Sequence, residues 1–283
     1  MKIEAGYHSS IATTGDAWRS DVLVRGLPRI MVKAHVLYGN GAALFNGLGE
    51  IIEDVGDRAL VCQRAGASGI SLRLHDEAGR LSRDAEFRRA IMMEVGYRTP
   101  GLYLQLALEN IGHQSLGDLE TLLATLQPDA VSLALADMVS CADLGALSDF
   151  YHRCWAAGID LQHVLRGEAE VFQLAEMIDD GIVPEENLKV LIEVESQIWG
   201  DFSAVEPAAA AIRQQLPDSD WALGARGPGE SACLYAAMML GGKVRIDCDA
   251  SFSGAPHGQG PALPGGRINE LVQMLGLDNA GRA

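Results

Sequence analysis

Short β-like segments alternate with amphipathic helical segments along almost the whole chain, and this alternation restricts the fold more than any other feature. Helical patterns such as DAEFRRAIMMEVG (84–96) separate the strands, and several of them stop at glycine, as helices commonly do. Eight strands, each followed by a helix or a final tail, predict an α/β protein with the (β/α)8 TIM barrel fold. The predicted strands are RIMVKAHVLYG (29–39), GISLRLH (69–75), GLYLQLALE (101–109), DAVSLALAD (129–137), IDLQHVL (159–165), KVLIEVE (189–195), DWALGAR (220–226) and KVRIDCD (243–249).

A doubly wound parallel sheet shows the same alternation, but its dinucleotide-binding form carries a Gly-rich GxGxxG turn after the first strand. This chain has only GNG (39–41) at that place, which disfavours that fold. We predict an N-terminal extension at residues 1–28 and a single barrel domain at residues 29–283. A Gly/Pro-rich loop (254–266) precedes the last predicted helix.

The charge of the chain restricts its partners. A formal net charge of −16 and a sequence pI of about 4.8 disfavour nucleic acid and anionic membranes as partners. A small anionic metabolite would need a local basic pocket within this acidic shell. The five dispersed cysteines favour reduced thiols over disulfides or a thiolate metal site. We also find no apolar signal segment and no membrane-spanning stretch, so we expect a cytoplasmic protein.

Polar side chains gather where the predicted strands end, and in a TIM barrel the active site lies at the carboxyl ends of the strands. On strand 69–75, the residues Ser71, Arg73 and His75 share one face, and strand 243–249 repeats this pattern. Polar groups that face into a barrel are costly unless they are paired or functional. The polar residues at or near strand ends are His35, Ser71, Arg73, His75, Gln105, Glu109, Ser132, His163, Glu193, Glu195, Arg226, Arg245, Asp247 and Asp249.

Two stretches resemble motifs of the β-keto acid cleavage enzymes, also called 3-keto-5-aminohexanoate cleavage enzymes. AGASGISLRLHDEAGRLSRD (65–84) resembles the second-strand motif of that family. WALGARGPGESACLYAAMMLGGKVRIDCDASF (221–252) resembles its last barrel unit, in which a Trp opens strand seven and GG-x-[VI]-R opens strand eight. The resemblance covers roughly residues 29–277.

This resemblance implies a (β/α)8 barrel, a homo-oligomer and a divalent metal such as zinc, which acts as Lewis acid toward the keto acid. Family members condense a β-keto acid with acetyl-CoA and cleave the adduct to acetoacetate and a new CoA thioester. Their metal ligands are His-x-His on strand two and a Glu on strand eight. An Asp beside that Glu is the base, and an Arg four residues before the Glu assists.

The family positions fall on changed residues in this chain. The two histidine ligands fall on Ser71 and Arg73, the ligand glutamate on Asp249, the base on Ala250, and the assisting arginine on Arg245. Because an arginine cannot ligate a metal, we expect the zinc of the family to be lost here. Asp249 remains a metal ligand only if a metal is present; otherwise we predict none.

Two further family positions concern the substrate. A substrate-binding Ser on strand three falls on Ala107, and a Thr on strand four falls on Ser132. The glutamate that follows strand one in the family falls in GNG (39–41) and is absent.

The changed site leaves several interpretations open. Arg73 and Asp249 would form an ion pair in place of the metal, either as a structural plug or, with Arg245 and Arg226, as an anion pocket. His75 is either an acid/base group or a structural histidine beside Asp76. His35 and His163 are alternative metal ligands or, more commonly for such residues, core histidines. Glu193 and Glu195 are catalytic carboxylates or ion-pair partners of Lys189 and Arg213.

We therefore predict a divergent enzyme of this family, a C–C bond-cleaving acyltransferase with acetyl-CoA as possible co-substrate. The alternative is a non-catalytic or metal-independent barrel that binds a small anionic metabolite through Arg73 and Arg245. The predicted catalytic residues are Arg245, His75 and Asp249, and the predicted substrate-binding residues are Arg73, Ser71, Ser132, Gln105 and Arg226.

Overall fold

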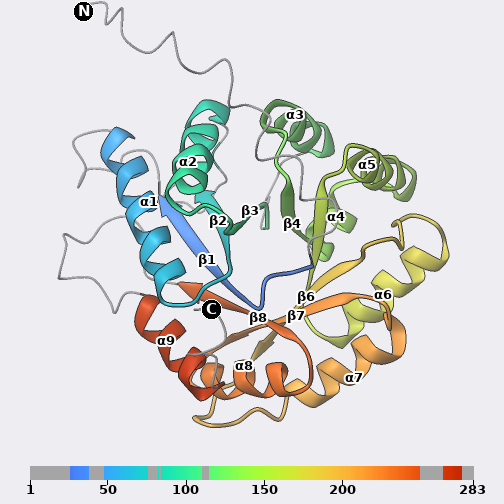
Figure 1. The fold of residues 1–283 in the computed structure, drawn as a ribbon. Helices are drawn as coiled ribbons and strands as arrows, with labels where there is room; N and C mark the ends of the chain where they lie inside the picture. Colours follow the sequence, from blue (N-terminus) through green and yellow to red (C-terminus); the bar gives the residue numbers. More distant parts are fainter. Residues whose placement is uncertain are drawn as a thin grey trace, which may run out of the picture.

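The computed structural model describes residues 26–37, 48–75, 82, 84–109, 115–248 and 264–275. Within these residues, eight parallel strands form a closed barrel in which each strand pairs with the next and β8 pairs with β1 (Figure 1). The predicted (β/α)8 barrel is thereby confirmed. The strands are β1 (Ile30–Leu37), β2 (Gly69–His75), β3 (Tyr103–Ala107), β4 (Ala130–Ala134), β5 (Asp160–Leu165), β6 (Lys189–Glu195), β7 (Asp220–Arg226) and β8 (Lys243–Cys248).

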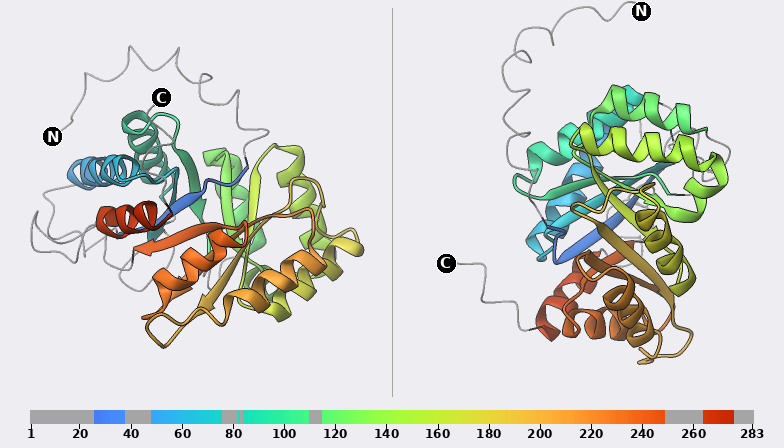
Figure 2. Two further views of the ribbon diagram at one scale, coloured as in Figure 1. Left: turned by 60° about the horizontal axis from the view of Figure 1, so that its bottom comes forward. Right: turned by 90° about the vertical axis from the view of Figure 1, so that its right-hand side faces the viewer.

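Helices surround the barrel as an outer ring. Figures 1 and 2 show α9 beside α1 and α8, where it closes this ring. The described helices are α1 (Leu48–Arg64), α2 (Ala85–Arg98), α3 (Leu116–Leu126), α4 (Leu135–Cys141), α5 (Leu144–Ala156), α6 (Glu168–Asp179), α7 (Val205–Gln215), α8 (Glu230–Met239) and α9 (Pro264–Met274). Three of them begin at a residue whose side chain accepts a hydrogen bond from a backbone N–H of the first turn, namely Asp84, Ser115 and Asp143.

The two faces of each strand meet different surroundings. On β1, Val32, Ala34 and Val36 belong to the core between the barrel and its helices. Met31 belongs instead to a smaller apolar cluster inside the barrel, and Lys33 follows on the same inner face. The period-2 pattern that predicted the strand therefore also decides which side chains enter the barrel.

Ion pairs join neighbouring strands at their amino-terminal ends. Lys189 on β6 pairs with Asp160 on β5, and Lys243 on β8 pairs with Asp220 on β7. Asp220 also accepts a hydrogen bond of 2.6 Å from the backbone N–H of Leu27, just before β1. We call these contacts the amino-end ion pairs. They connect β5 with β6, β7 with β8, and Leu27, before β1, with β7, at the end opposite to the predicted active site.

One predicted strand includes residues that are helical in the structure. The segment 129–137 was expected to be a strand throughout, but β4 ends at Ala134 and helix α4 begins at Leu135. Leu135 and Met138 are both buried, and their spacing of three residues places them on one face of a helix. The strand prediction for residues 135–137 is therefore wrong, because a short apolar run fits both periods.

The described cysteines Cys62, Cys141, Cys154 and Cys233 are free thiols. Burial raises the pKa of Cys62 and of Cys154 to about 12. These two thiols stay protonated near neutral pH, as expected for structural cysteines. In the described part of the chain, no helix has both the length and the apolar character needed to cross a bilayer.

His163 lies in the wall of the barrel rather than in a polar site. Its ring centroid is 5.3 Å from that of Tyr151 on α5, and the residue is buried. Its Nδ1 atom has no hydrogen-bond partner within the described structure. Burial lowers the pKa of His163 from 6.5 to about 4. The imidazole is therefore neutral in the folded protein at pH 7.

The buried His163 predicts a loss of stability in mild acid. Between pH 6.5 and about 4, the unfolded chain binds a proton that folded His163 does not, so stability falls as the pH falls through this window. At about 1.4 kcal/mol per pKa unit, the full loss is about 3 kcal/mol. Urea unfolding of the wild type and of the His163→Leu variant at several pH values measures it. An equal pH dependence of both proteins in this window would contradict the prediction.

Candidate active site

Charged side chains from five strands, and from Glu109 just after β3, meet inside the barrel toward the carboxyl ends of the strands. We call this group the central cluster. In the described part of the chain it contains four cationic side chains, three carboxylates and one histidine. Its members are Lys33, His35, Arg73, Glu109, Glu193, Arg226, Arg245 and Asp247.

Glu109, just after β3, is the innermost carboxylate of the central cluster. It is paired with the ammonium group of Lys33. It also accepts hydrogen bonds of 2.7 Å from the Arg245 guanidinium and 2.8 Å from the Ser132 hydroxyl. Burial alone would raise the pKa of Glu109, but Arg245 and Lys33 lower it by more, so the net pKa lies below its ordinary value of 4.5. Glu109 is therefore ionised, and it contacts Lys33, Ser132 and Arg245.

Arg245 on β8 links Glu109 to a second carboxylate. Its other terminal nitrogen lies 2.7 Å from Glu193 on β6, and only 2% of the Arg245 side chain is exposed. Burial would lower the pKa of Arg245, but Glu109, Glu193 and Asp247 raise it. Arg245 is thus a buried cation that holds two carboxylates in place.

Arg226 lies at the rim of the central cluster, at the end of β7. Its guanidinium is 3.3 Å from Glu193 and 3.9 Å from Asp247, and 56% of its side chain is exposed. These contacts are longer than those of Arg245, and the side chain faces solvent. Arg226 is therefore the cluster arginine best able to take up a second anion.

His35, on β1, connects the cluster to His75. Its Nε2 atom is 2.8 Å from a carboxylate oxygen of Asp247 on β8. Burial would raise the pKa of Asp247, but the hydrogen bond from His35 and the charge of Lys33 lower it below its ordinary value. The ring of His75, at the end of β2, packs edge-on against His35 with the centroids 5.5 Å apart. The His35 imidazole is thus held by a carboxylate toward the carboxyl end of the barrel.

A neutral polar row crosses the barrel beside the cluster. The Ser71 hydroxyl donates to Gln105 at 2.8 Å, and the Gln105 amide donates to Gln162 at 3.1 Å. All three side chains are buried. The predicted substrate-binding residues Ser71 and Gln105 therefore hydrogen-bond to each other, whereas Ser132 contacts the central cluster through Glu109.

The structure brings together most of the described residues that the sequence singled out. Arg73, Arg226 and Arg245 belong to the central cluster, and His75 contacts it through His35. Burial lowers the pKa of Arg73, whereas the charges of Glu109 and Asp247 raise it. The predicted site residue Asp249, together with Ala250 and Asp76, lies outside the described residues. The Arg73–Asp249 pair therefore stays a prediction.

Two expectations about the carboxylates of β6 need correction. Glu193 pairs with Arg245 and Arg226, not with Lys189 or Arg213. Lys189 pairs instead with Asp160 at the amino-terminal end of the barrel, and Arg213 pairs with Glu206 on α7. Sequence proximity suggested the wrong partners because adjacent strands and the barrel interior join residues that are far apart in the chain.

Sequence reasoning missed Lys33 and gave no role to Glu109. Lys33 is the one charged residue in the otherwise apolar segment IMVKAHVL and shares the inner face with His35. A lysine in that position has to find a carboxylate inside the barrel. The single lysine in this apolar strand is the signal from which Lys33 could have been identified.

The residues at the family's two histidine positions do not fit a divalent metal. Ser71 is engaged with Gln105, and the guanidinium of Arg73 repels a cation. Among the residues that the structure describes, no group of three His, Cys, Asp or Glu side chains is arranged to hold a metal ion. Ser71 and Arg73 offer a hydroxyl group and a guanidinium, which suit an anion better than a metal ion.

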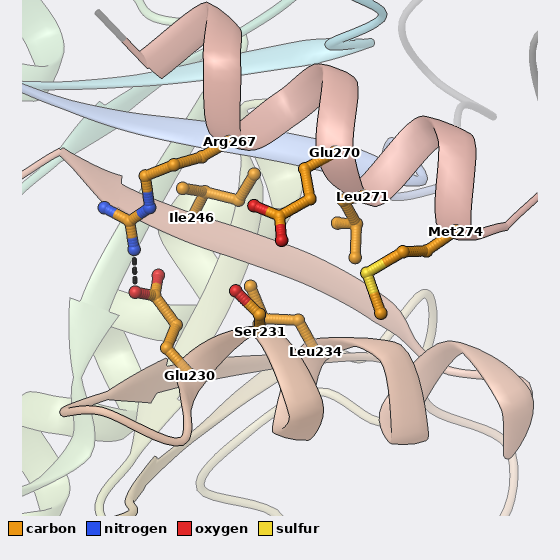
Figure 3. A pocket seen from close by; sticks show the side chains of 8 residues that line it. All are labelled: Glu230, Ser231, Leu234, Ile246, Arg267, Glu270, Leu271 and Met274. Atoms are coloured by element: carbon orange, nitrogen blue, oxygen red, sulfur yellow. Dashed lines mark ion pairs between the residues drawn. The ribbon is translucent and has the colours of Figure 1, made fainter. Parts of the chain in front are cut away.

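Two cavities lie away from the central cluster. Between α8 and α9, a hollow of about 10 Å³ is bordered by the Arg267–Glu230 ion pair (Figure 3), and it has room for about one water molecule. A larger cavity of about 470 Å³ lies beside α5 and near the amino-terminal ends of β5–β7, with Trp155, Asp160 and Lys189 in its wall. The pairing of Glu230 with Arg267 joins helices α8 and α9.

A sequence model of the beta-keto acid cleavage enzyme family matches residues 50–252, which is more than half of the chain. The match runs from α1 through β8 and does not include β1. Among curated proteins, none matches this chain.

Solved structures with the same fold include three enzymes or biosynthetic proteins of low sequence identity. A type I 3-dehydroquinate dehydratase from Clostridium difficile has 12% identity and a TM-score of 0.58, over 89% of this chain and 93% of that chain. A dihydrodipicolinate synthase from Agrobacterium tumefaciens has 14% identity and a TM-score of 0.53, over 92% and 78%. A spore coat polysaccharide biosynthesis protein from Bacillus subtilis has 16% identity and a TM-score of 0.55, over 90% and 70%. At these identities the likeness shows the barrel fold alone.

Proposed function

Since this chain belongs to the beta-keto acid cleavage enzyme family, we propose that it is an enzyme that binds a β-keto acid by its carboxylate and cleaves it by acyl transfer with acetyl-CoA. We further propose that it does so without a metal at positions 71 and 73, where the family resemblance places histidines. The substrate class follows from the family, and the mode of binding follows from the arginines of the central cluster.

The observation that carries this proposal is the exposed guanidinium of Arg226 beside a buried charged network. Arg226 is 56% exposed and only loosely paired with Glu193 and Asp247. A guanidinium presents parallel N–H donors that match a carboxylate in a bidentate geometry. We assign Arg226 to the substrate carboxylate, with Arg73 as the second cation of the same binding surface.

Arg245 has a different role in this proposal. It is buried and already holds Glu109 and Glu193 at 2.7 Å each, so we assign it as a positioning residue. It orients Glu193, which in turn contacts Arg226 at 3.3 Å. We assign proton transfer to His35, which is held by Asp247, and to the neighbouring His75, because an imidazole ring can both donate and accept a proton.

The alternative function is anion binding without catalysis. It is favoured by one observation, the replacement of the family's histidine positions by Ser71 and Arg73. A turnover assay distinguishes the two functions. A catalytic and a non-catalytic protein would both bind a β-keto acid, but only the catalytic one would convert it.

We expect the Arg226→Gln variant to lose 10- to 150-fold in kcat/KM, mainly through a higher KM. This range corresponds to the loss of one charge-assisted hydrogen bond, about 1.5–3 kcal/mol. The assay combines acetyl-CoA with a panel of β-keto acids of different chain length and follows the new CoA thioester. Arg213→Gln is the matched control, because Arg213 is an exposed arginine paired with a glutamate on α7.

Three results would contradict the proposal. Binding of the longer β-keto acids of the panel in calorimetry, without formation of a new CoA thioester, would favour the non-catalytic function. Equal activity of the Arg226→Gln and Arg213→Gln variants would remove Arg226 from the site. Stoichiometric zinc in the purified protein, with turnover lost on chelation, would refute the metal-free part.

A further inference from the structure

The distribution of lysine in this chain is unusual. The sequence has only four lysines, namely Lys2, Lys33, Lys189 and Lys243. Among the described residues, Lys189 and Lys243 form the amino-end ion pairs. Lys33 is the one described lysine in the central cluster. Its position on β1 also lies outside the segment matched by the family model, which begins at residue 50.

Lys33 lies at the floor of the central cluster. Its side chain is 2% exposed, whereas the exposed fraction rises to 18% for His35 and to 56% for Arg226. By register, Lys33 is opposite Ser71 on β2 and Asp247 on β8. Position 71 is one of the two positions where the family resemblance places a metal-binding histidine. The ammonium group therefore comes from the strand residue beside that position.

Two cations share one carboxylate at this floor. Lys33 and Arg245 both contact Glu109, and the Arg245 bond measures 2.7 Å. A lysine that is desolvated and placed next to another cation is an activated amine, since both effects favour its neutral form. Glu109 accepts the hydrogen bond from the Lys33 Nζ atom, so a proton acceptor lies in direct contact with the amine.

We propose that Lys33 is a catalytic nucleophile that condenses with the keto group of the β-keto acid to form a protonated imine. This inference rests on the proposed function, because it needs a β-keto acid with its carboxylate held at the rim by Arg226. The keto carbon then points down the barrel toward the Lys33 floor.

The condensation balances without any further reactant. The ammonium form of Lys33 transfers one proton to Glu109, and the free amine attacks the keto carbon to form a new C–N bond. The proton returns from Glu109 to the substrate oxygen, which becomes a hydroxyl group on the carbon that now carries the protonated nitrogen. Glu109 then relays one of the two protons of this nitrogen to the hydroxyl group, and the C–O bond breaks with loss of water. The product is a cationic C=N bond that carries the remaining proton. Hydrolysis by water reverses these steps and restores Lys33.

A protonated imine activates the substrate in the same way as a metal ion bound to a ketone oxygen. Its positive charge withdraws electrons from the former keto carbon and makes the hydrogens of the adjacent carbon more acidic. Burial lowers the pKa of Lys33, and Arg245 lowers it further, whereas Glu109 raises it; the net pKa lies below the ordinary value of 10.5. The direction of this shift agrees with the geometry.

The test is reductive trapping on the full chain. The protein is incubated with acetoacetate and with longer β-keto acids in the presence of sodium cyanoborohydride, and the modified residue is located by peptide mass spectrometry. We expect a substrate-dependent adduct at Lys33 and none at Lys189, which is also buried and paired with a carboxylate. The small number of lysines makes the assignment direct.

Variants separate this inference from the proposed function. We expect Lys33→Arg, which keeps the positive charge beside Glu109, to lose the adduct and at least 100-fold in kcat, whereas Lys189→Arg keeps the adduct. Turnover of a β-keto acid by the wild type without an adduct at Lys33 would overturn the inference and leave the proposed function standing. Absence of both turnover and acetoacetate binding would refute the proposed function itself. Reductive trapping on the wild-type protein tests whether Lys33 forms the imine even if the Lys33→Arg variant does not fold.

Discussion

We expect the free energy of unfolding of the Glu109→Gln variant to be about 3–5 kcal/mol lower than that of the wild type near pH 7. Glu109 is the carboxylate shared by Lys33 and Arg245, and each of these two cationic side chains is only 2% exposed. Removal of one partner from a buried ion pair leaves an uncompensated charge in the interior, and this is the range of its cost. Urea unfolding followed by circular dichroism measures the change.

A surface pair provides the control for this prediction. Glu206 pairs with Arg213 on α7, and both side chains are exposed, so Glu206→Gln is expected to change the stability by less than about 1 kcal/mol. The pKa of Glu109 lies below its ordinary value of 4.5. Its contribution is therefore complete above about pH 4.5 and is lost as the pH falls, so the two curves approach each other in acid. A loss below about 1 kcal/mol for Glu109→Gln at pH 7 would show that the network is not stabilising.

The second large effect is expected at Gly227, which follows Arg226 at the carboxyl end of β7. Its φ of +90° is rarely adopted by other residues, and an added Cβ would lie 2.3 Å from the backbone oxygen of Ser196. The strained backbone costs about 1–2 kcal/mol and the steric overlap about 1–3 kcal/mol. We expect Gly227→Ala to lower the free energy of unfolding by about 2–5 kcal/mol.

Gly200→Ala separates the two causes. Gly200 has a φ of +74°, but no atom lies within 4 Å of the position of an added Cβ. Its substitution should therefore cost only the backbone strain, about 1–2 kcal/mol. If both variants lose the same stability in urea unfolding, the contact between Gly227 and Ser196 has no energetic weight.

The sequence was sufficient for the barrel because its strands have regular alternation. The strands predicted at 69–75, 189–195 and 220–226 agree with the structure at both ends, and they end on His75, Glu195 and Arg226. The helix α4 was missed, because Leu135 and Met138 satisfy the spacing of a helix as well as the end of an apolar strand. Short apolar runs of this kind are decided by tertiary packing and not by local pattern.

The candidate site was predictable by position but not by partner. That Arg73, Arg226 and Arg245 would meet followed from the rule that strand ends converge in a barrel. That Glu109 would lie between Lys33 and Arg245 depended on the strand register and on side-chain reach, which a single sequence does not encode locally. The same holds for His163, whose alternation suggested a site residue but whose ring packs against Tyr151 on α5.

The amino-end ion pairs have a consequence for how such a barrel can diverge in evolution. They involve Asp160, Lys189, Asp220 and Lys243 and share no residue with the central cluster. These pairs connect β5 with β6 and β7 with β8 at the amino-terminal ends of the strands. The side chains at positions 71 and 73 can therefore change without removing a contact that holds these strands together. Side chains at the carboxyl ends of the strands can thus be substituted while the amino-end ion pairs stay in place.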